Sequence, residues 1–173
     1  MIEVISGDIT EQAVDAIVNA ANPSLMGGGG VDGAIHAAAG PDLVTECRDV
    51  RQRSFPNGLP TGQAVVTSAG DLPARFVIHT VGPKFWEHPD GGAELLAAAH
   101  RNCLVEAQRV EAVSVAFPAI SCGVYGWRPK DAAPIAVAAV REALGELPEI
   151  RIVRFVLYND DALSAYRWAL AED

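Results

Sequence analysis

The sequence lacks any apolar run long enough to cross a membrane. Residues 132–140 form an apolar run of nine residues that contains Pro134, whereas a bilayer requires about 20 apolar residues in succession. The chain begins directly with an alternating apolar and polar stretch, without a basic segment that leads into an apolar one, so we expect no secretion signal. These features predict a cytoplasmic protein that has no membrane partner.

Cysteines and basic residues are scarce. The three cysteines form no CxxC pair, and their odd number favours reduced thiols over a disulfide framework. No histidine stands at a zinc-finger spacing from them, so we expect no metal site. The net charge is -9, and without a cluster of lysine and arginine we expect no surface that wraps nucleic acid. Local dipoles would therefore have to hold any anionic ligand.

The sequence does contain a regular alternation of short Val- and Ile-rich segments with longer amphipathic ones. We expect strands at residues 2–6, 16–19, 63–68, 76–80, 114–120 and 151–158. We expect helices at residues 31–39, 42–53, 92–110, 130–144 and 160–171. Within the third helix, one apolar stripe should lie on the sheet, and it comprises Leu95, Ala99, Cys103, Ala107 and Val110.

This alternation predicts an α/β fold in a single domain that spans residues 1–173. The runs FVIHTV and VSVAFPAI suit strands that are buried on both faces, which indicates a three-layer α/β/α sandwich. Ligands of such folds collect at the carboxyl ends of the strands, where loops lead into helices.

The most unusual stretch is NAANPSLMGGGGVDGAIH at 19–36, which places four successive glycines beside an acid at the expected start of a helix. A glycine run can serve a turn that needs positive φ, or a backbone that approaches a ligand closely. Four glycines exceed what one turn requires, and the free N–H groups of the following helix would face the same space. We therefore expect a phosphate site, shared with the loop AISCGVYG at 119–126 after another expected strand.

This glycine run resembles two known nucleotide-binding motifs in part. Gly28, Gly30 and Gly33 fit the spacing G-x-G-x-x-G, which alone is a weak signal of a dinucleotide fold. The acidic residue expected about twenty positions further on is missing. No Gly-Lys-Ser/Thr follows the run, which excludes a P-loop. The expected phosphate site depends on neither motif.

Several side chains near these loops admit two roles. Asp32 can be a first-turn acid favoured by the helix dipole, or a group that orients sugar hydroxyls or water, because a carboxylate would repel a phosphate. Asn22, which precedes a proline, can equally be a turn former. Tyr158 can be a capping aromatic or a flat surface for a base.

No nucleophile can be assigned from the sequence. Ser121 in AISCG resembles a nucleophile elbow, but every histidine precedes it, whereas α/β-hydrolases place the histidine after the serine. Cys122 has no evident partner base, and we expect it to be a buried thiol. His79 falls inside an expected strand, where we predict a hydrogen-bonded core residue.

Six motifs occur in an order that resembles the macrodomain family. They are GDIT at 7–10, IVNAAN at 17–22, GGGGVDGAIHAAAG at 27–40, PTGQAV at 60–65, VIHTVGP at 77–83 and AISCGVYG at 119–126. The resemblance covers essentially the whole chain and is strongest to the MacroD-type ADP-ribosylhydrolases. It implies a mixed six-stranded sheet between helices, with an ADP-ribose cleft at the strand ends.

The resemblance also implies where each part of ADP-ribose would bind. Asp8 would accept a hydrogen bond from the adenine amino group, the Ile9 backbone would support the ring, and Tyr158 would stack on it. Asn22 and Asp32 would flank the distal ribose. The pyrophosphate would lie between two loops, bound from one side by Ser121, Gly123, Val124 and Tyr125 and from the other by Gly30 and Val31.

Members of this type remove mono-ADP-ribose from aspartate and glutamate side chains of proteins and deacetylate O-acetyl-ADP-ribose. The resemblance thus implies a hydrolase. Our mechanistic hypothesis is that Asp32, alone or with a pyrophosphate oxygen, positions and partly deprotonates a water while Asn22 fixes the ribose, so that no metal and no cofactor are required. A non-catalytic ADP-ribose reader and an unrelated NAD enzyme are the alternatives.

The expected partners are ADP-ribose, mono-ADP-ribosylated proteins and O-acetyl-ADP-ribose, and without a heptad stripe we expect a monomer. ADP-ribosylated DNA stays open as a substrate, although the lysine of a different macrodomain class has no evident counterpart in these loops. Two departures from the family pattern bear on substrate preference and affinity. Cys122 replaces the more usual Thr or Ala, and the segment WRPKDAA at 127–133 stands where many relatives have a single aromatic followed directly by Pro, so we expect a different rim near Trp127 and Arg128.

Overall fold

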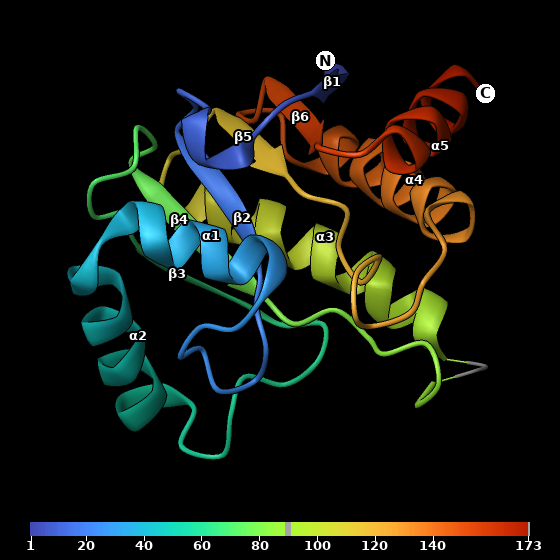
Figure 1. The fold of residues 1–173 in the computed structure, drawn as a ribbon. Helices are drawn as coiled ribbons and strands as arrows, with labels where there is room; N and C mark the ends of the chain where they lie inside the picture. Colours follow the sequence, from blue (N-terminus) through green and yellow to red (C-terminus); the bar gives the residue numbers. More distant parts are fainter. Residues whose placement is uncertain (89–90, 173) are drawn as a thin grey trace.

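A central sheet of six strands organises the residues that the computed structural model describes, 1–88 and 91–172 (Figure 1). The strands are β1 (Ile2–Ser6), β2 (Ala16–Ala20), β3 (Ala64–Ser68), β4 (Phe76–Thr80), β5 (Ser114–Phe117) and β6 (Ile152–Leu157). The helices are α1 (Gly30–Ala39), α2 (Pro41–Ser54), α3 (Gly92–Arg109), α4 (Pro129–Glu146) and α5 (Asp160–Ala171), together with the short 3₁₀ helix η1 (Ile9–Glu11).

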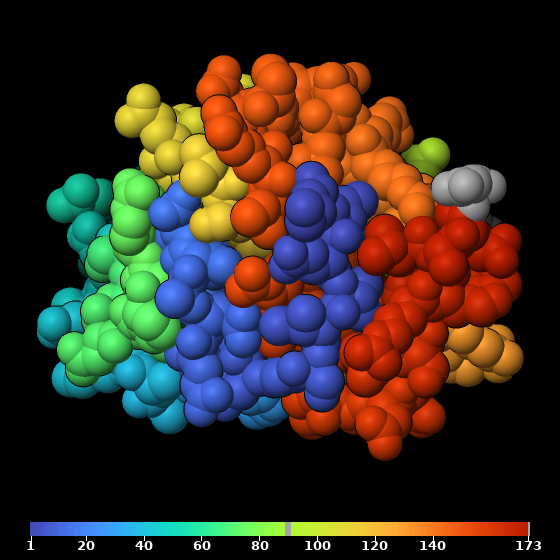
Figure 2. Space-filling view, turned by 90° about the horizontal axis from the view of Figure 1, so that it is seen from above, coloured from blue at the N-terminus to red at the C-terminus, as the bar shows by residue number. Residues whose placement is uncertain are grey.

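The strands lie in the order β1-β6-β5-β2-β4-β3, and every neighbouring pair is parallel except β3 with β4. The predicted mixed six-stranded sheet is therefore confirmed. Because β2 and β5 are parallel neighbours, the loops that follow them leave the same edge of the sheet. The first strand pairs with the last, which brings the N-terminal segment beside α5 (Figure 2).

Helices cover both faces of the sheet, as the buried runs FVIHTV and VSVAFPAI predict. One core lies between the sheet and α1, α2 and η1, and the other lies between the sheet and α3, α4 and α5. Alternate strand residues point into opposite cores, so that Ile17 of β2 faces α1 while Val18 faces the other layer. This three-layer arrangement confirms the predicted fold class (Figure 1).

The expected elements agree with the structure except at particular points. The fifth strand ends at Phe117 rather than at residue 120, because Pro118 has no N–H to donate to the sheet. Three members of the predicted stripe on α3 are buried as expected, namely Ala99, Cys103 and Ala107, whereas Leu95 and Val110 are only partly buried. The buried face also includes Leu96, His100 and Leu104. The helix η1 was not predicted. No described helix is both long enough and apolar enough to cross a membrane.

Candidate active site

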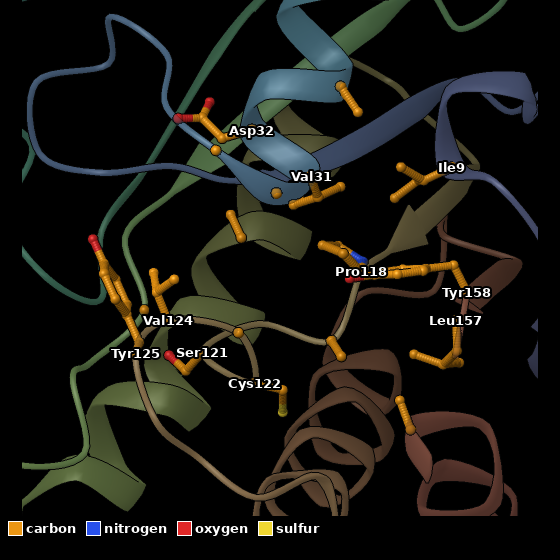
Figure 3. A pocket seen from close by; sticks show the side chains of 18 of the residues that line it. Ile9, Val31, Asp32, Pro118, Ser121, Cys122, Val124, Tyr125, Leu157 and Tyr158 are labelled. Carbon is orange, nitrogen blue, oxygen red and sulfur yellow. The ribbon is translucent and has the colours of Figure 1, made fainter. Parts of the chain in front are cut away.

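A pocket of about 870 Å³ opens at the carboxyl edge of the sheet, above β2 and β5. Its walls come from η1, the glycine-rich loop before α1, the loop after β5 and the residues after β6. Figure 3 shows Asp32 and Tyr125 toward one end of the pocket and Ile9 and Tyr158 toward the other. Every site residue predicted from the sequence lines this pocket, so the two predicted loops do share one crevice.

One wall is the N-terminal end of α1, which begins inside the glycine run. Gly29 is the N-cap, and Gly30 has φ +58°, a conformation that side chains rarely adopt. The first N–H groups of a helix have no carbonyl partner within it, so those of this wall are available to an anion. Gly33 is required for a different reason, since a Cβ there would lie 2.5 Å from the carbonyl oxygen of Gly28.

The opposite wall is the loop that follows β5. Its shape depends on Ser121, which has φ +68°, and on hydrogen bonds from Gly126 N to Gly123 O (3.1 Å) and from Trp127 N to Ser121 O (3.1 Å). Ser121 packs so closely on Gly82 that a Cβ at residue 82 would overlap its Oγ. Internal hydrogen bonds and close packing against Gly82 thus hold the loop in shape.

Asp32 stands in the first turn of α1 and is only 5% exposed. Its Oδ1 accepts a hydrogen bond from Nδ2 of Asn19 (2.8 Å) and lies 3.4 Å from Nε2 of His36, one helical turn further on. Burial raises the pKa of this carboxyl, whereas the Asn19 hydrogen bond and the proximity of His36 act in the opposite direction. With a raised pKa, Asp32 takes up a proton at a higher pH than an exposed aspartate does.

Asn22 follows β2 and is held rigidly in the glycine-rich loop. Its Nδ2 donates to Gly27 O (2.9 Å), while its Oδ1 accepts from Ser24 N (3.0 Å) and from the Ser24 hydroxyl. A Cβ added to Gly28 would lie 3.2 Å from Oδ2 of Asp32 and 3.3 Å from Nδ2 of Asn22. The two predicted catalytic side chains therefore flank the backbone of Gly28.

The other end of the pocket is open and aromatic. Tyr158 follows β6 and is 80% exposed, and Asn159 rather than the tyrosine caps α5 by accepting from Ala162 N (2.9 Å). Tyr158 therefore does not cap α5, and its role as a flat surface for a base stays a prediction. Asp8 is the N-cap of η1, where its Oδ1 accepts from Thr10 N (2.9 Å) and from Thr10 Oγ1 (2.7 Å).

The macro domain family model matches residues 18–136, which is more than half of the chain. The chain belongs to the macro domain family. Among its relatives, a macro domain-containing protein of Streptomyces coelicolor is 53% identical over 95% of this chain and 95% of its own length. A protein of Enterobacter cloacae named O-acetyl-ADP-ribose deacetylase is 52% identical over 99% of this chain and 94% of its own length.

Solved structures agree with the family. A macrodomain of Oceanobacillus iheyensis with ADP superposes at a TM-score of 0.94 with 45% identity, over 98% of this chain and 89% of that one. A Trypanosoma brucei macrodomain in complex with ADP-ribose superposes at a TM-score of 0.88 with 36% identity, over 98% of this chain and 69% of that one. The resemblance inferred from the six motifs is thus confirmed at the level of the family and the fold.

The side chains that could act as nucleophiles in this macrodomain lack activation. Ser121 Oγ has no hydrogen-bond partner among the described residues, so no base contacts it there. Burial raises the pKa of the Cys122 thiol to about 12, which keeps it protonated near neutral pH. In the described parts of the chain, no three His, Cys, Asp or Glu side chains are grouped so that they could hold a metal ion.

Two neighbours of Asp32 were missed by the sequence reasoning. His36 follows Asp32 by four residues on a helix, and this spacing alone places the two side chains on one face. Asn19 contacts Asp32 only because β2 runs beneath α1, which no local pattern discloses. His79 is a fully buried, hydrogen-bonded core residue, as predicted.

Proposed function

We propose that this macrodomain is a hydrolase that removes mono-ADP-ribose from acidic side chains of proteins and the acetyl group from O-acetyl-ADP-ribose. One observation carries the proposal: Asn22 and Asp32 flank Gly28 at one end of a pocket that has an exposed aromatic ring at its other end. Relatives of about 50% identity that are named O-acetyl-ADP-ribose deacetylase support the same chemistry.

In this proposal ADP-ribose spans the pocket from Tyr158 to Asp32. The adenine stacks on the exposed ring of Tyr158, and its amino group donates to Asp8 beside the backbone of Ile9. The pyrophosphate lies between the two loops, where main-chain N–H groups and the positive end of α1 offset its charge. The residues proposed to contact it are Gly30 and Val31 on one side and Ser121, Gly123, Val124 and Tyr125 on the other.

With the adenine on Tyr158, we propose that the distal ribose lies between Asn22 and Asp32. This placement supports a carboxylate as catalyst, because the acid lies beyond the pyrophosphate and beside the bond that breaks. The protein's net charge of -9 would repel an anionic ligand, so binding depends on these local N–H dipoles.

We propose that Asp32 holds a water and withdraws a proton from it as the water attacks the ester, while Asn22 fixes the ribose. The bond between the acyl carbon and the ribose oxygen then breaks, and the proton taken by Asp32 passes to that oxygen, so that water and the ester give ADP-ribose with a free hydroxyl and a free carboxylic acid. General-base help of about 10²–10⁴ in rate suffices for an already labile ester, so the proposed mechanism needs no metal ion. The raised pKa of Asp32 supports this role, because a base is most effective when its pKa approaches the operating pH.

The competing function is a reader that binds ADP-ribose without cleaving it. Mass spectrometry of glutamate-, serine- and nucleobase-linked substrates, incubated side by side with the protein, separates the two functions. The proposal expects loss of the glutamate-linked modification first. A protein that binds free ADP-ribose in calorimetry yet leaves all three substrates intact is a reader, and this proposal is then wrong.

The NAD-enzyme alternative predicts a different preference among ligands. A pocket shaped for a free distal ribose should bind ADP-ribose clearly more tightly than NAD, and calorimetric titration of both ligands compares them directly. We further propose that residues 1–173 act as one domain, since the strands of the described residues share one sheet, and as a monomer, since the sequence has no heptad stripe. Light scattering at working concentration checks the oligomeric state.

A further inference from the structure

A chain of hydrogen-bonded side chains leads from the pocket into the core beneath α1. Asp32 accepts from Nδ2 of Asn19 (2.8 Å), and the same nitrogen lies 3.1 Å from Nδ1 of His79. Nε2 of His79 lies 2.9 Å from Oγ1 of Thr67, which also lies 2.9 Å from the backbone oxygen of Ser68. These four linked side chains are all buried, and of the four only Asp32 lines the pocket.

Strand pairing in the sheet fixes the positions of these linked side chains. Asn19 and His79 are paired in register on the parallel strands β2 and β4, so both side chains project toward α1 and α2. Thr67 stands on β3, the antiparallel neighbour of β4. Three strands and one helix therefore contribute one side chain each to a single path of contacts.

The contacts define the direction of every hydrogen bond. The amide NH₂ of Asn19 can only donate, so Nδ1 of His79 must accept and its proton must reside on Nε2. Nε2–H then donates to Oγ1 of Thr67, whose own hydroxyl donates to Ser68 O. The carbonyl oxygen of Asn19 has no partner among the described residues, so its NH₂ group alone determines how the amide is turned.

Burial disfavours the charged form of Asp32, whereas the hydrogen bond from Asn19 and the proximity of His36 favour it. His79 is neutral, because burial lowers its pKa to about 3, with a further contribution from His36. Cys47 of α2, whose Sγ lies 3.7 Å from Nε2 of His79, is also neutral, since burial raises its pKa to about 12. The other titratable groups that face Asp32 or its neighbours are His36 on the same helix, Tyr125 across the pocket and Glu46 beside Cys47.

We propose that Asn19 and His79 are positioning residues, whose hydrogen-bond polarity presents an N–H to Oδ1 of Asp32 and so keeps this carboxylate ionised, with Oδ2 left for the reacting water. The proposal deepens the hydrolase function proposed above and rests on it for the role of Asp32. If the hydrogen bonds ran in the reverse direction, they would disfavour the ionised form of Asp32. With the proton on Nδ1 of His79, Asn19 must turn its carbonyl oxygen toward Asp32, which disfavours the charged form.

The direction of these hydrogen bonds can be measured in the unmodified protein through the tautomer of His79. Nitrogen-15 NMR of the free protein distinguishes the two imidazole tautomers of His79 without any substitution. We expect Nε2 of His79 to be protonated and Nδ1 to be unprotonated. A His79 that carries its proton on Nδ1 overturns the proposal.

Asn19→Leu removes the donor with little change in volume. We expect the Asp32 carboxyl, followed by carbon-13 NMR, to titrate at higher pH than in the wild type. The acidic limb of the kcat/KM profile should move in the same direction, with a loss of about tenfold on that limb, because a hydrogen bond to a charged group is lost. An unchanged titration of Asp32 in a folded variant contradicts the proposal.

Thr67→Val tests the same path from its far end, without touching the pocket or Asp32. The loss of the acceptor for Nε2–H should weaken the preference for this tautomer and raise the pH at which Asp32 titrates, though by less than Asn19→Leu does. Thr80→Val is the matched control, since Thr80 is an equally buried neighbour of His79 on β4 that donates instead to Gln63 O (2.8 Å). If Thr67→Val and Thr80→Val titrate alike, the path does not act as proposed, even where Asn19→Leu fails to fold.

These readouts separate this proposal from the proposed hydrolase function. The NMR titration needs no substrate, so it tests the positioning role even if no linkage is hydrolysed. If Asn19→Leu shifts the titration of Asp32 while the kcat/KM profile stays fixed, the positioning role stands and the catalytic role of Asp32 is wrong.

Discussion

The two ends of the pocket are built in opposite ways. At the Asp32 end, Asp32 is buried and Asn22 is partly buried, and hydrogen bonds tie them to β2 and to the glycine-rich loop. At the Tyr158 end, the aromatic ring is 80% exposed. One end is preorganised around a carboxylate, and the other offers an open surface.

This difference indicates a division of labour between reaction and affinity. A buried, hydrogen-bonded acid has a defined orientation and a shifted pKa, both of which matter to a chemical step. An exposed aromatic ring contributes stacking area, which affects binding in the ground state and the transition state alike. We therefore expect substitutions at the Asp32 end to lower turnover and those at the Tyr158 end to weaken binding.

The largest expected effect follows from Asp32→Ala. Loss of the proposed base should lower turnover on a glutamate-linked substrate by about 10²–10⁴ while calorimetry shows ADP-ribose binding largely retained. Asp42→Ala is the matched control, because Asp42 is an exposed first-turn acid of α2. Full turnover by Asp32→Ala would mean that the Asp32 end of the pocket does not carry the reaction.

Tyr158→Ala should have the next largest effect, and it should act on affinity. Base–aromatic stacking contributes about 1–3 kcal/mol, so we expect ADP-ribose to bind about 5- to 150-fold more weakly in calorimetry while kcat at saturating substrate stays near that of the wild type. Tyr158→Phe keeps the ring and should bind almost normally. A fall in kcat with unchanged affinity runs against the assignment of this end to binding.

Gly28→Ala should lower turnover by about tenfold, since a methyl group forced between two packed side chains costs about 1–3 kcal/mol. The added Cβ would lie 3.2 Å from Oδ2 of Asp32 and 3.3 Å from Nδ2 of Asn22. Gly145→Ala on α4, where nothing lies within 4 Å of the new Cβ, should leave the rate unchanged. Equal rates for both variants in the same assay would mean that the spacing of the two side chains does not limit the reaction.

The smallest expected effect is on stability, at the loop between the two ends. Ser121→Gly removes a non-glycine residue at φ +68° and a buried hydroxyl that has no partner among the described residues. We expect a gain of about 1 kcal/mol or less in the free energy of unfolding, because the extra freedom of glycine in the unfolded chain offsets part of the relief. Ser121→Ala keeps the strained backbone and should gain less, and chemical denaturation of both variants tests this order.

Much of the fold could be predicted from local sequence, because strand and helix periods are local properties. The convergence of the loops after β2 and β5 followed from the general rule for α/β sheets. The end of β5 was misplaced because the apolar pattern continues through Pro118, which has no N–H for the ladder. Three members of the predicted stripe on α3 are buried, but the buried face also includes Leu96, His100 and Leu104, because several faces of that helix carry apolar residues.

The candidate site could be predicted only in part, and the missing part is tertiary. Motifs in the loops identified Asn22 and Asp32, whereas the contact of Asn19 with His79 joins residues sixty positions apart. Its cause is the pairing of β2 with β4, which no motif in either strand reports. Local patterns therefore indicated which side chains border the pocket, but not the buried side chains that orient them.

A crystal structure of this protein with ADP-ribose tests the central claim most directly. The account predicts the adenine on Tyr158, the diphosphate within hydrogen-bond distance of main-chain N–H groups from both loops, and the distal ribose beside Oδ2 of Asp32. A ligand bound in the reverse direction, or with its distal ribose away from Asp32, would contradict the account.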